Sequence, residues 1–384
     1  MRILVYRWKA YNQYDLFLAL AMRGHKIEEI PFSLSNYEID EEFARKLTAY
    51  IDEHPCDMVL SVNYFPPISE VCHNKGISYV SWCCDSPVLS MYDRSVFNDV
   101  NTIFTFDKLN QIEFETMGAR VFYLPLCACT PRTDKTIAET DGAPYACDIS
   151  FVGSMYRKNQ YDKLCDKMPE YLRGYFDAVI ALQAGCIDEY LLDDALSADI
   201  MRETQKVFNL SKASGSMSDL SLIFETTVLG FKIARERRYS ILPDLSKRYE
   251  VNVYTDDEIE PVHGKNKGTC DYWSESPLVF NNSKINLNLT ITNIRSGIPL
   301  RVWDIMGCGG FLLTDYRAEM PMYFKEGEDM EMFRDKAELL DKVRYYLGHE
   351  DARRKVAASG YAKVKAFHNY DNRLDEMAKT VRGI

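Results

Sequence analysis

The sequence predicts an α/β protein made of two doubly wound parallel sheets, and three observations support this fold class. Short, almost continuously apolar runs alternate with amphipathic or polar-faced segments, which is typical of parallel strands covered by helices on both faces. The alternation stops in the polar residues 131–144 and starts again at Asp148. With 384 residues the chain is too long for one ordinary core and suits two domains of usual size.

The first half of the chain contains the elements of one sheet. Strands are expected over residues 3–6, 27–32, 57–62, 77–84, 102–106 and 121–124, and helices over 14–22, 41–53, 68–74 and 109–117. Residues 131–144 are rich in Thr, Asp, Lys and Glu and contain Gly142, a composition typical of an interdomain linker. We therefore place the first domain at residues 1–140.

The second half repeats the alternation around a long helical region. Strands are expected over 148–152, 249–254, 285–290 and 311–314, and helices over 278–283, 336–347, 351–367 and 373–381. Residues 160–240 are mostly helical, which predicts an insertion after the first of these strands. In the last helix the apolar residues from Leu374 to Val381 follow the spacing i, i+3, i+4, i+7, so one face must be buried. The second domain is expected at 146–369.

Composition argues against several classes of protein. A content of 46% hydrophobic and 27% charged residues is that of a soluble globular protein, and a net charge of −11 argues against nucleic-acid partners and anionic membrane surfaces. No apolar stretch reaches membrane-spanning length, and the first residues lack the layout of a signal peptide. The eleven cysteines form no Cys-x-x-Cys pair, which indicates reduced thiols. We expect a cytoplasmic protein with no integral membrane segment.

Residues 295–310 carry the strongest signal for a binding site. Ser296 and Gly297 form a small-residue turn, and Pro299 stands where the first residue of a helix is expected, because its missing N–H would be unpaired there. The backbone amides and dipole of a helix N-terminus bind anions such as a diphosphate. Asp304, one turn further on, is placed to accept two hydrogen bonds from a ribose. These features predict a nucleotide-sugar site. The alternative is that Gly297 and Pro299 only shape the connection between two elements and that Asp304 is a solvated helix residue.

Two flanking segments extend this signal into a resemblance. With SKINLN at residues 283–288 and HNYDNR at 368–373, the stretch resembles the C-terminal half of GT-B glycosyltransferases, and more narrowly the CgeB-like (spore-maturation), DUF3880-containing group. The similarity is dense from residue 281 to 373 and thinner elsewhere. It implies the GT-B fold, in which two Rossmann-like domains face each other across a cleft, here with a helical insertion in the second. It also implies that the C-terminal helix, residues 370–384, crosses back onto the first domain.

The resemblance further implies a glycosyltransferase that moves a sugar from a UDP-, GDP- or dTDP-linked donor to an acceptor hydroxyl. The acceptor, a glycan, a protein or a small molecule, would bind the first domain and the donor the second. No Asp-x-Asp motif is present to hold a cation at the diphosphate, so transfer is expected to be metal-independent and to use no cofactor. The alternative is a non-catalytic nucleotide-sugar-binding or surface- or spore-assembly protein that keeps the fold.

Candidate donor ligands come from loops that follow strands, because ligands of open α/β sheets bind beyond the carboxyl ends of the strands. Arg157 and Lys158 resemble the cations that hold the diphosphate in related enzymes, although their spacing differs; a solvated Arg-Lys pair is the alternative. Related enzymes often have Glu-x7-Glu where this chain has Ser296 and Asp304, so the resemblance implies a ribose contact for Asp304. His263 could meet a nucleobase or be an ordinary loop histidine. The residues expected to bind the donor are Gly153, Arg157, Lys158, His263, Arg295, Ser296, Gly297, Ile298, Arg301 and Asp304.

One carboxylate of the first domain is a candidate for catalysis. Asp85 follows a buried strand at the edge that faces the expected cleft, where it would act as general base toward an acceptor hydroxyl. The alternative is a turn-forming residue before Ser-Pro, which turn statistics favour. No metal site is expected. The residues expected to line the acceptor pocket are Tyr11, Asn12, Asn63 and Tyr64.

Overall fold

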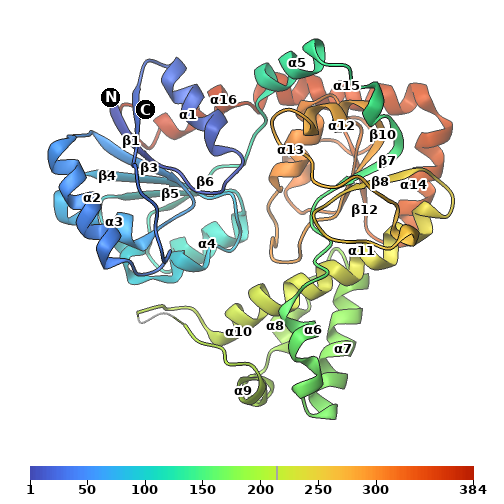
Figure 1. Cartoon of the computed structure of the whole chain (residues 1–384), viewed down its shortest axis with the longest axis horizontal. Helices are drawn as coiled ribbons and strands as arrows, with labels where there is room; N and C mark the ends of the chain where they lie inside the picture. Colours follow the sequence, from blue (N-terminus) through green and yellow to red (C-terminus); the bar gives the residue numbers. More distant parts are fainter. Residues whose placement is uncertain (213–214) are drawn as a thin grey trace.

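The computed structural model describes residues 1–212 and 215–384 and contains two six-stranded, wholly parallel sheets (Figure 1). The first sheet is built from residues 2–123 and the second from residues 147–333, and we call the parts around them the N-terminal and C-terminal halves. Both sheets carry helices on both faces, which confirms the predicted fold class. Among the described residues, none of the helices has the length and apolarity needed to cross a bilayer.

The first sheet has the strand order β2-β1-β3-β4-β5-β6. The strands are β1 Arg2–Tyr6, β2 Lys26–Glu29, β3 Met58–Val62, β4 Ser78–Trp82, β5 Asn101–Thr105 and β6 Val121–Tyr123, and the helices α1 Gln13–Met22, α2 Glu41–Glu53, α3 Pro66–Lys75 and α4 Lys108–Thr116. The central strands β3 and β5 are buried along their whole length, as their continuous apolar runs predict. The order reverses between β1 and β3, so the loops after these two strands diverge and leave a crevice.

The second sheet has the order β9-β8-β7-β10-β11-β12, with its reversal between β7 and β10. The strands are β7 Cys147–Val152, β8 Val251–Tyr254, β9 Lys265–Asn266, β10 Ser283–Asn288, β11 Leu312–Asp315 and β12 Glu331–Phe333, and the helices α12 Ser276–Asn282, α13 Leu300–Gly307, α14 Lys336–Gly348 and α15 Glu350–Phe367. The edge strands β9 and β12, of two and three residues, were not predicted. Pro299 is the residue before α13 and has an extended backbone, so the prediction that it opens the helix was wrong by one residue.

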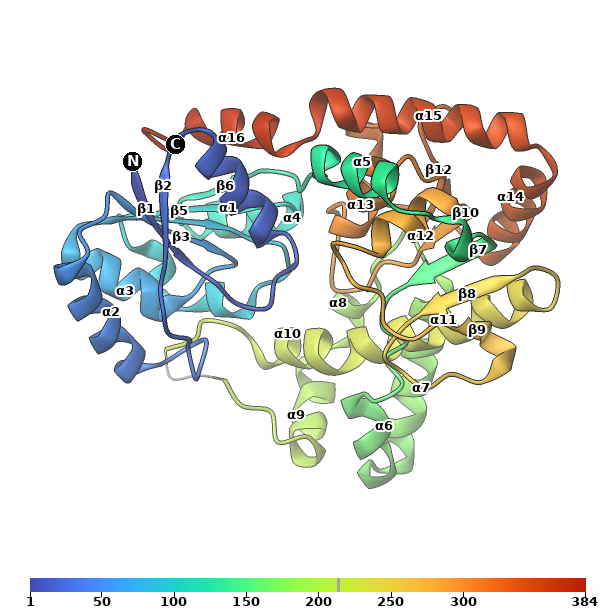
Figure 2. The same cartoon turned by 45° about the horizontal axis from the view of Figure 1, so that its top comes forward.

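A helical region follows β7, as the sequence predicts. It comprises α6 Gln160–Leu164, α7 Glu170–Gly185, α8 Leu192–Ala195, α9 Ala198–Val207, α10 Leu220–Phe224, a π-helix Glu225–Leu229 and α11 Gly230–Ser246. It has its own hydrophobic core, which includes Phe176, Phe208 and Phe224. The region extends away from the second sheet, and the segment before α10 reaches the N-terminal half (Figures 1 and 2). There the Met217 amide donates to the Tyr92 carbonyl oxygen at 2.6 Å.

The stretch predicted to connect the domains lies between the two sheets and is largely a helix, α5 Thr130–Glu139, which the sequence did not predict. The helix forms because its buried face meets other elements: the Thr133 hydroxyl donates to the Gly307 carbonyl oxygen at 3.1 Å, and α5 packs against α12. A short polar segment cannot reveal such tertiary contacts through its own pattern.

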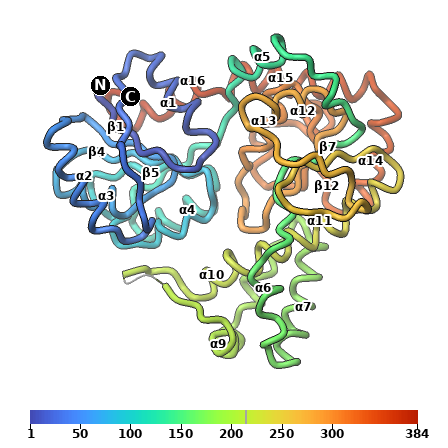
Figure 3. Tube along the Cα trace, in the orientation of Figure 1, coloured from blue at the N-terminus to red at the C-terminus, as the bar shows by residue number. Residues whose placement is uncertain are grey.

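The last helix, α16 Tyr370–Ala378, lies against α1 in the N-terminal half (Figure 2). Arg373 is 1% exposed, and its Nε donates to the Pro125 carbonyl oxygen at 2.8 Å. The Tyr370 hydroxyl donates to the Asn12 carbonyl oxygen at 3.1 Å. The two ends of the chain lie close together at this half (Figure 3).

Candidate active site

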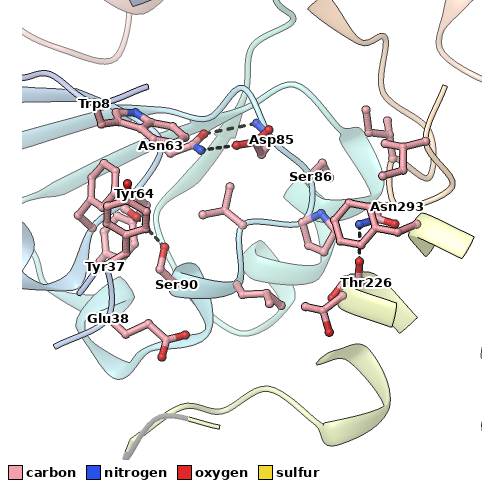
Figure 4. Close-up of a pocket in the computed structure, with 18 of the residues that line it drawn as sticks. Trp8, Tyr37, Glu38, Asn63, Tyr64, Asp85, Ser86, Ser90, Thr226 and Asn293 are labelled. Carbon is pink, nitrogen blue, oxygen red and sulfur yellow. Dashed lines mark hydrogen bonds between the residues drawn. The ribbon is translucent and has the colours of Figure 1, made fainter. Parts of the chain in front are cut away.

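The first candidate site lies where loops from both sheets meet. A cavity of about 510 Å³, which we call the interdomain pocket, is lined by the loops after β1, β3 and β4 on one side and after β7 and β10 on the other (Figure 4). The π-helix and the start of α11 complete its wall. Both strand-order reversals therefore open onto one cavity, as expected for ligand sites of doubly wound sheets.

Asp85 enters this pocket from the loop after β4 and is held by Asn63 (Figure 4). Asn63 Nδ2 donates to Asp85 Oδ2 at 2.7 Å, and Asn63 Oδ1 accepts from the Cys84 amide at 2.8 Å. The backbone donor at Oδ1 fixes the orientation of the Asn63 amide, so its NH₂ group must point to the carboxylate. Asn63 has a φ of +63°, a left-handed conformation that asparagine tolerates better than most residues.

The surroundings of Asp85 favour proton uptake. Burial among the walls of the pocket raises the pKa of its carboxyl, and the hydrogen bond from Asn63 offsets part of this shift. A carboxylate with a raised pKa, held in one orientation at the edge of a cavity, can accept a proton from a bound hydroxyl.

A second cavity of about 310 Å³, which we call the strand-end pocket, lies at the carboxyl ends of β7 and β8. It brings together two of the predicted donor ligands, Gly153 and Arg301, with Tyr11 of the N-terminal half and Tyr272. The Tyr11 and Tyr272 rings stack with centroids 5.1 Å apart. Arg301 therefore supplies a cation, and the exposed Tyr11 an aromatic ring, in one cavity.

Asp304 lies beside this pocket and contacts it through Tyr272. The Tyr272 hydroxyl donates to Asp304 Oδ1 at 2.9 Å, and Asp304 is only 8% exposed. Burial raises the pKa of Asp304 to about 6, against the opposing effects of Arg301, Tyr272 and Arg132. A buried carboxylate with this pKa destabilises the fold at neutral pH, which favours a role in binding over one in stability.

The turn that precedes α13 is occupied by a carboxylate of the other half. The Arg295 and Ser296 amides donate to Asp107 Oδ2 at 3.0 and 3.4 Å, and the Ser296 hydroxyl donates to Asp107 Oδ1 at 2.6 Å. A Cβ on Gly297 would lie 2.9 Å from the Phe106 carbonyl oxygen, and Ile298 is buried. Arg295 and Ser296, both predicted to bind the donor, thus bind the side chain of Asp107 from the other half.

Four other predicted donor ligands lie outside the two pockets. Arg157 is exposed and pairs with Glu258. Lys158 is exposed next to it. His263 is buried with its ring 4.3 Å from that of Tyr239. The guanidinium of Arg295 donates to Asp193 at 2.6 and 3.0 Å and to Glu225 at 3.0 Å, which anchors the helical region.

Several lining residues were not identified from the sequence. Tyr272 belongs to an irregular stretch between β9 and α12, and Phe231 and Thr226 belong to the helical region. Neither segment has a periodicity that marks one face as functional. Tyr156, three residues after Gly153, was within reach of the strand-end rule, since it follows β7 directly.

Comparison with known proteins identifies the second part of the chain. Residues 241–379 match the family described as Glycosyl transferase-like. Those residues include β8, β10, α13 and the strand-end pocket residues Tyr272 and Arg301. A comparison with curated protein sequences gives no match.

Solved structures resemble the whole chain. A glycosyltransferase from Rickettsia africae has a TM-score of 0.52 at 8% identity, over 98% of this chain and 97% of its own. HepE from Anabaena in complex with UDP has a TM-score of 0.51 at 9% identity, and T4 phage BGT in complex with its UDP-glucose substrate has 0.52 at 11%, each over 100% of both chains. At these identities the likeness shows the fold. The chain therefore has the GT-B fold, and residues 241–379, in its C-terminal half, match the Glycosyl transferase-like family.

Proposed function

We propose that the protein transfers a sugar from a nucleoside-diphosphate-sugar to an acceptor hydroxyl in the interdomain pocket. One observation carries the proposal: a carboxylate of the N-terminal half, Asp85, lies in a cavity whose opposite wall comes from the loops after β7 and β10. That arrangement places a proton acceptor opposite the half that would hold the donor. The complexes of HepE with UDP and of T4 phage BGT with UDP-glucose support a nucleotide-sugar as donor.

The donor is proposed to bind in the strand-end pocket. Gly153 has no side chain, so the backbone after β7 can approach a phosphate closely, and Arg301 supplies positive charge. The exposed Tyr11 ring, which stacks on Tyr272, offers a surface on which a nucleobase or ribose can lie, and Asp304 holds the Tyr272 hydroxyl. The sugar would then extend toward Tyr156, which lines the interdomain pocket.

In the proposed reaction the oxygen of the acceptor hydroxyl bonds to the anomeric carbon of the donor sugar, and Asp85 takes the proton of that hydroxyl. The bond from that carbon to the diphosphate breaks, and Arg301 stabilises the charge of the leaving nucleoside diphosphate. Closure of the two halves excludes water, which would otherwise compete with the acceptor.

Three finer assignments belong to the same proposal. We place the domains at residues 1–140 and 146–369, with residues 370–384 returning to the first. The chain is proposed to belong to the CgeB-like, DUF3880-containing group, on its segments 283–288 and 368–373. In keeping with its eleven free cysteines, all within the described residues, we propose a cytoplasmic location.

The experiment that tests the function has two stages. Thermal unfolding with UDP, GDP, dTDP and their sugars should reveal the donor as the nucleotide that raises Tm, because a ligand that binds only the folded state stabilises it. Labelled donor is then incubated with candidate acceptors, and transfer is separated from hydrolysis by chromatography. A nucleotide-sugar that binds without transfer or hydrolysis would contradict the proposed reaction.

Asn63→Gly is expected to move the acid limb of the pH profile of kcat/KM to higher pH. The base must be unprotonated, so activity rises as pH passes the pKa of Asp85; loss of the hydrogen bond that favours the charged form raises this pKa further. Glycine suits the left-handed backbone at this position. Gly substitution of Asn209, an exposed residue outside the pocket, is the control. An unchanged acid limb would show that Asn63 does not set the protonation of the base.

Asp304→Asn is expected to stabilise the fold and weaken nucleotide binding. The raised pKa of Asp304 means that its contribution to stability is full below about pH 3.8 and is lost as pH rises through about 6. Asparagine does not ionise and avoids the cost of a buried charge. The free energy of unfolding of the variant at pH 8 should therefore exceed that of the wild type by about 1–3 kcal/mol. Binding should weaken by about 1 kcal/mol, because the Tyr272 hydroxyl, which helps to form the pocket, loses its charge-assisted hydrogen bond.

Urea unfolding at pH 5 and 8 and calorimetric titration with nucleotide measure the two effects of Asp304→Asn. The exposed Asp351→Asn serves as control. Unchanged affinity for every nucleotide that binds the wild type would remove Asp304 from the donor site.

Transfer is expected to proceed at full rate in EDTA. Arg301 and backbone amides are proposed to neutralise the diphosphate, and the sequence has no Asp-x-Asp motif. The measurement is initial rate after dialysis against EDTA, with and without added Mg²⁺ or Mn²⁺. Loss of turnover in EDTA with recovery on adding either metal would refute this assignment of charge.

A further inference from the structure

We infer that the acceptor is an uncharged or cationic compound that presents the face of a ring, and that the interdomain pocket rejects anionic acceptors. The inference rests on the proposed function, since it names the acceptor class of that same pocket. It is carried by the aromatic walls of the pocket and by the sign of the charges between them.

One wall consists of aromatic rings from the N-terminal half. Trp8, Tyr37 and Phe65 contact one another edge to face, with ring centroids between 5.4 and 6.0 Å apart. The indole N–H of Trp8 donates to the Val62 carbonyl oxygen at 2.6 Å, which fixes the ring. Tyr37 is 46% exposed, so part of this wall is open to a ligand. Rings held in place in this way stack on sugars or aromatic groups at little cost in side-chain entropy.

The facing wall has a second aromatic pair, Tyr156 and Phe231, with centroids 5.2 Å apart. Phe231 stands at the start of α11, directly after the π-helix that brings Thr226 to the pocket. The Asn293 Nδ2 donates to the Thr226 carbonyl oxygen at 2.9 Å and ties this turn to the loop after β10 (Figure 4). Single π-turns within α-helices frequently mark functional sites. The helical region thus contributes a wall to the acceptor pocket.

The charges in the pocket have one sign. Among its described lining residues the ionisable acids are Glu38 and Asp85, and none is Lys or Arg. Arg238 lies over the Tyr156 ring at 4.6 Å but donates to the Leu289 carbonyl oxygen, and it does not line the cavity. An anionic acceptor would lose its hydration here without gaining a counter-ion, next to two carboxylates. A neutral hydroxyl compound meets no such cost, and a cation is attracted by the two carboxylates.

The test is calorimetric titration of the full chain with three matched probes: phenyl β-glucoside and its para-trimethylammonium and para-carboxylate derivatives. We expect the neutral and cationic probes to bind, and the carboxylate to bind at least about tenfold more weakly. Methyl β-glucoside and benzyl alcohol, titrated separately, show which ring binds; binding of either supports the inference. Titration needs no turnover, so its result is independent of whether sugar transfer occurs.

Two variants with matched controls locate the effect. Tyr37→Ala should weaken the neutral probe about two- to tenfold, while Tyr171→Ala, on an exposed tyrosine of α7, should not. Glu38→Gln should reduce the difference in affinity between the cationic and the carboxylate probe. The matched control Glu139→Gln, which changes an exposed carboxylate elsewhere, should leave this difference unchanged. Glu38→Gln changes a surface loop and should keep the Tm of the wild type. Tyr37→Ala loses ring contacts with Trp8 and Phe65 and should lower Tm slightly, so titrations are made well below the Tm of both variants. Equal binding of the carboxylate and neutral probes, or no binding of any probe, would overturn the inference.

Discussion

Replacing Asp85 with asparagine is expected to lower the kcat of sugar transfer by about 10²–10⁴-fold, the usual contribution of a general base. Asparagine has the shape of aspartate and can still meet Asn63 after an amide rotation, but it cannot accept the proton of the acceptor hydroxyl. Donor binding should not change, because Asp85 lies in the interdomain pocket and the proposed donor site is the strand-end pocket. The variant therefore separates chemistry from binding.

The measurement is the initial rate of transfer at saturating donor, together with the rise in Tm caused by the nucleotide. Asp99→Asn, which changes an exposed carboxylate of the same half, is the matched control. If Asp85→Asn transfers at more than about one tenth of the wild-type rate, another group takes the proton. Donor hydrolysis without acceptor should be affected less, because water needs less precise positioning.

Ending the chain after Phe367 is expected to abolish transfer and to destabilise the N-terminal half. The truncation removes Leu374 and Met377, both fully buried, each worth about 1.5–3 kcal/mol of burial free energy. It also removes Arg373, whose guanidinium donates to the carbonyl oxygens of Pro125 and Leu126. Those buried acceptors would lose their donor, at a further cost of about 1–3 kcal/mol.

A milder variant, Arg373→Ala, tests the same contact without shortening the chain. Burial and the Arg373 guanidinium lower the pKa of His368 to about 4, so His368 is neutral near pH 7 and its Nδ1 accepts from Arg373 at 3.0 Å. Thermal unfolding, small-angle scattering and transfer rate are measured for both variants, with the exposed Lys379→Ala as control. Full activity and an unchanged scattering profile after truncation would show that α16 does not hold the two halves in place.

Most strands were predictable because each is a short apolar run, and burial on both faces imposes that composition. The same reasoning missed β9 and β12, since two or three residues at a sheet edge leave no pattern. It also misread α5, whose buried Thr130 and Thr133 are covered by residues that lie far away in the sequence. A local sequence pattern predicts a helix or strand only where the composition of the segment itself shows which of its residues are buried.

The candidate site also contains residues that the sequence could indicate and residues whose surroundings it could not. Asp85 and Gly153 could be predicted to line pockets because the ends of parallel strands meet at one edge, a rule that needs no knowledge of side-chain partners. Arg157 and Arg295 have partners, Glu258 and Glu225, that are separated from them by 101 and 70 residues, and nothing local to either arginine reveals them. Whether a cation is free for a ligand depends on such distant pairs.

The chain passes between the two halves at two places, and these lie side by side. The Ala128 amide, just before α5, donates to the His368 carbonyl oxygen at 3.1 Å, just before α16. A rotation of one half about this line would separate the two halves most at the side farthest from it. Other contacts also cross between the halves, those of Asp107 with Arg295 and Ser296 and that of Met217 with Tyr92, and such a rotation would strain or break them. Met217 belongs to the helical region, so this region adds to the contact that holds the halves against rotation.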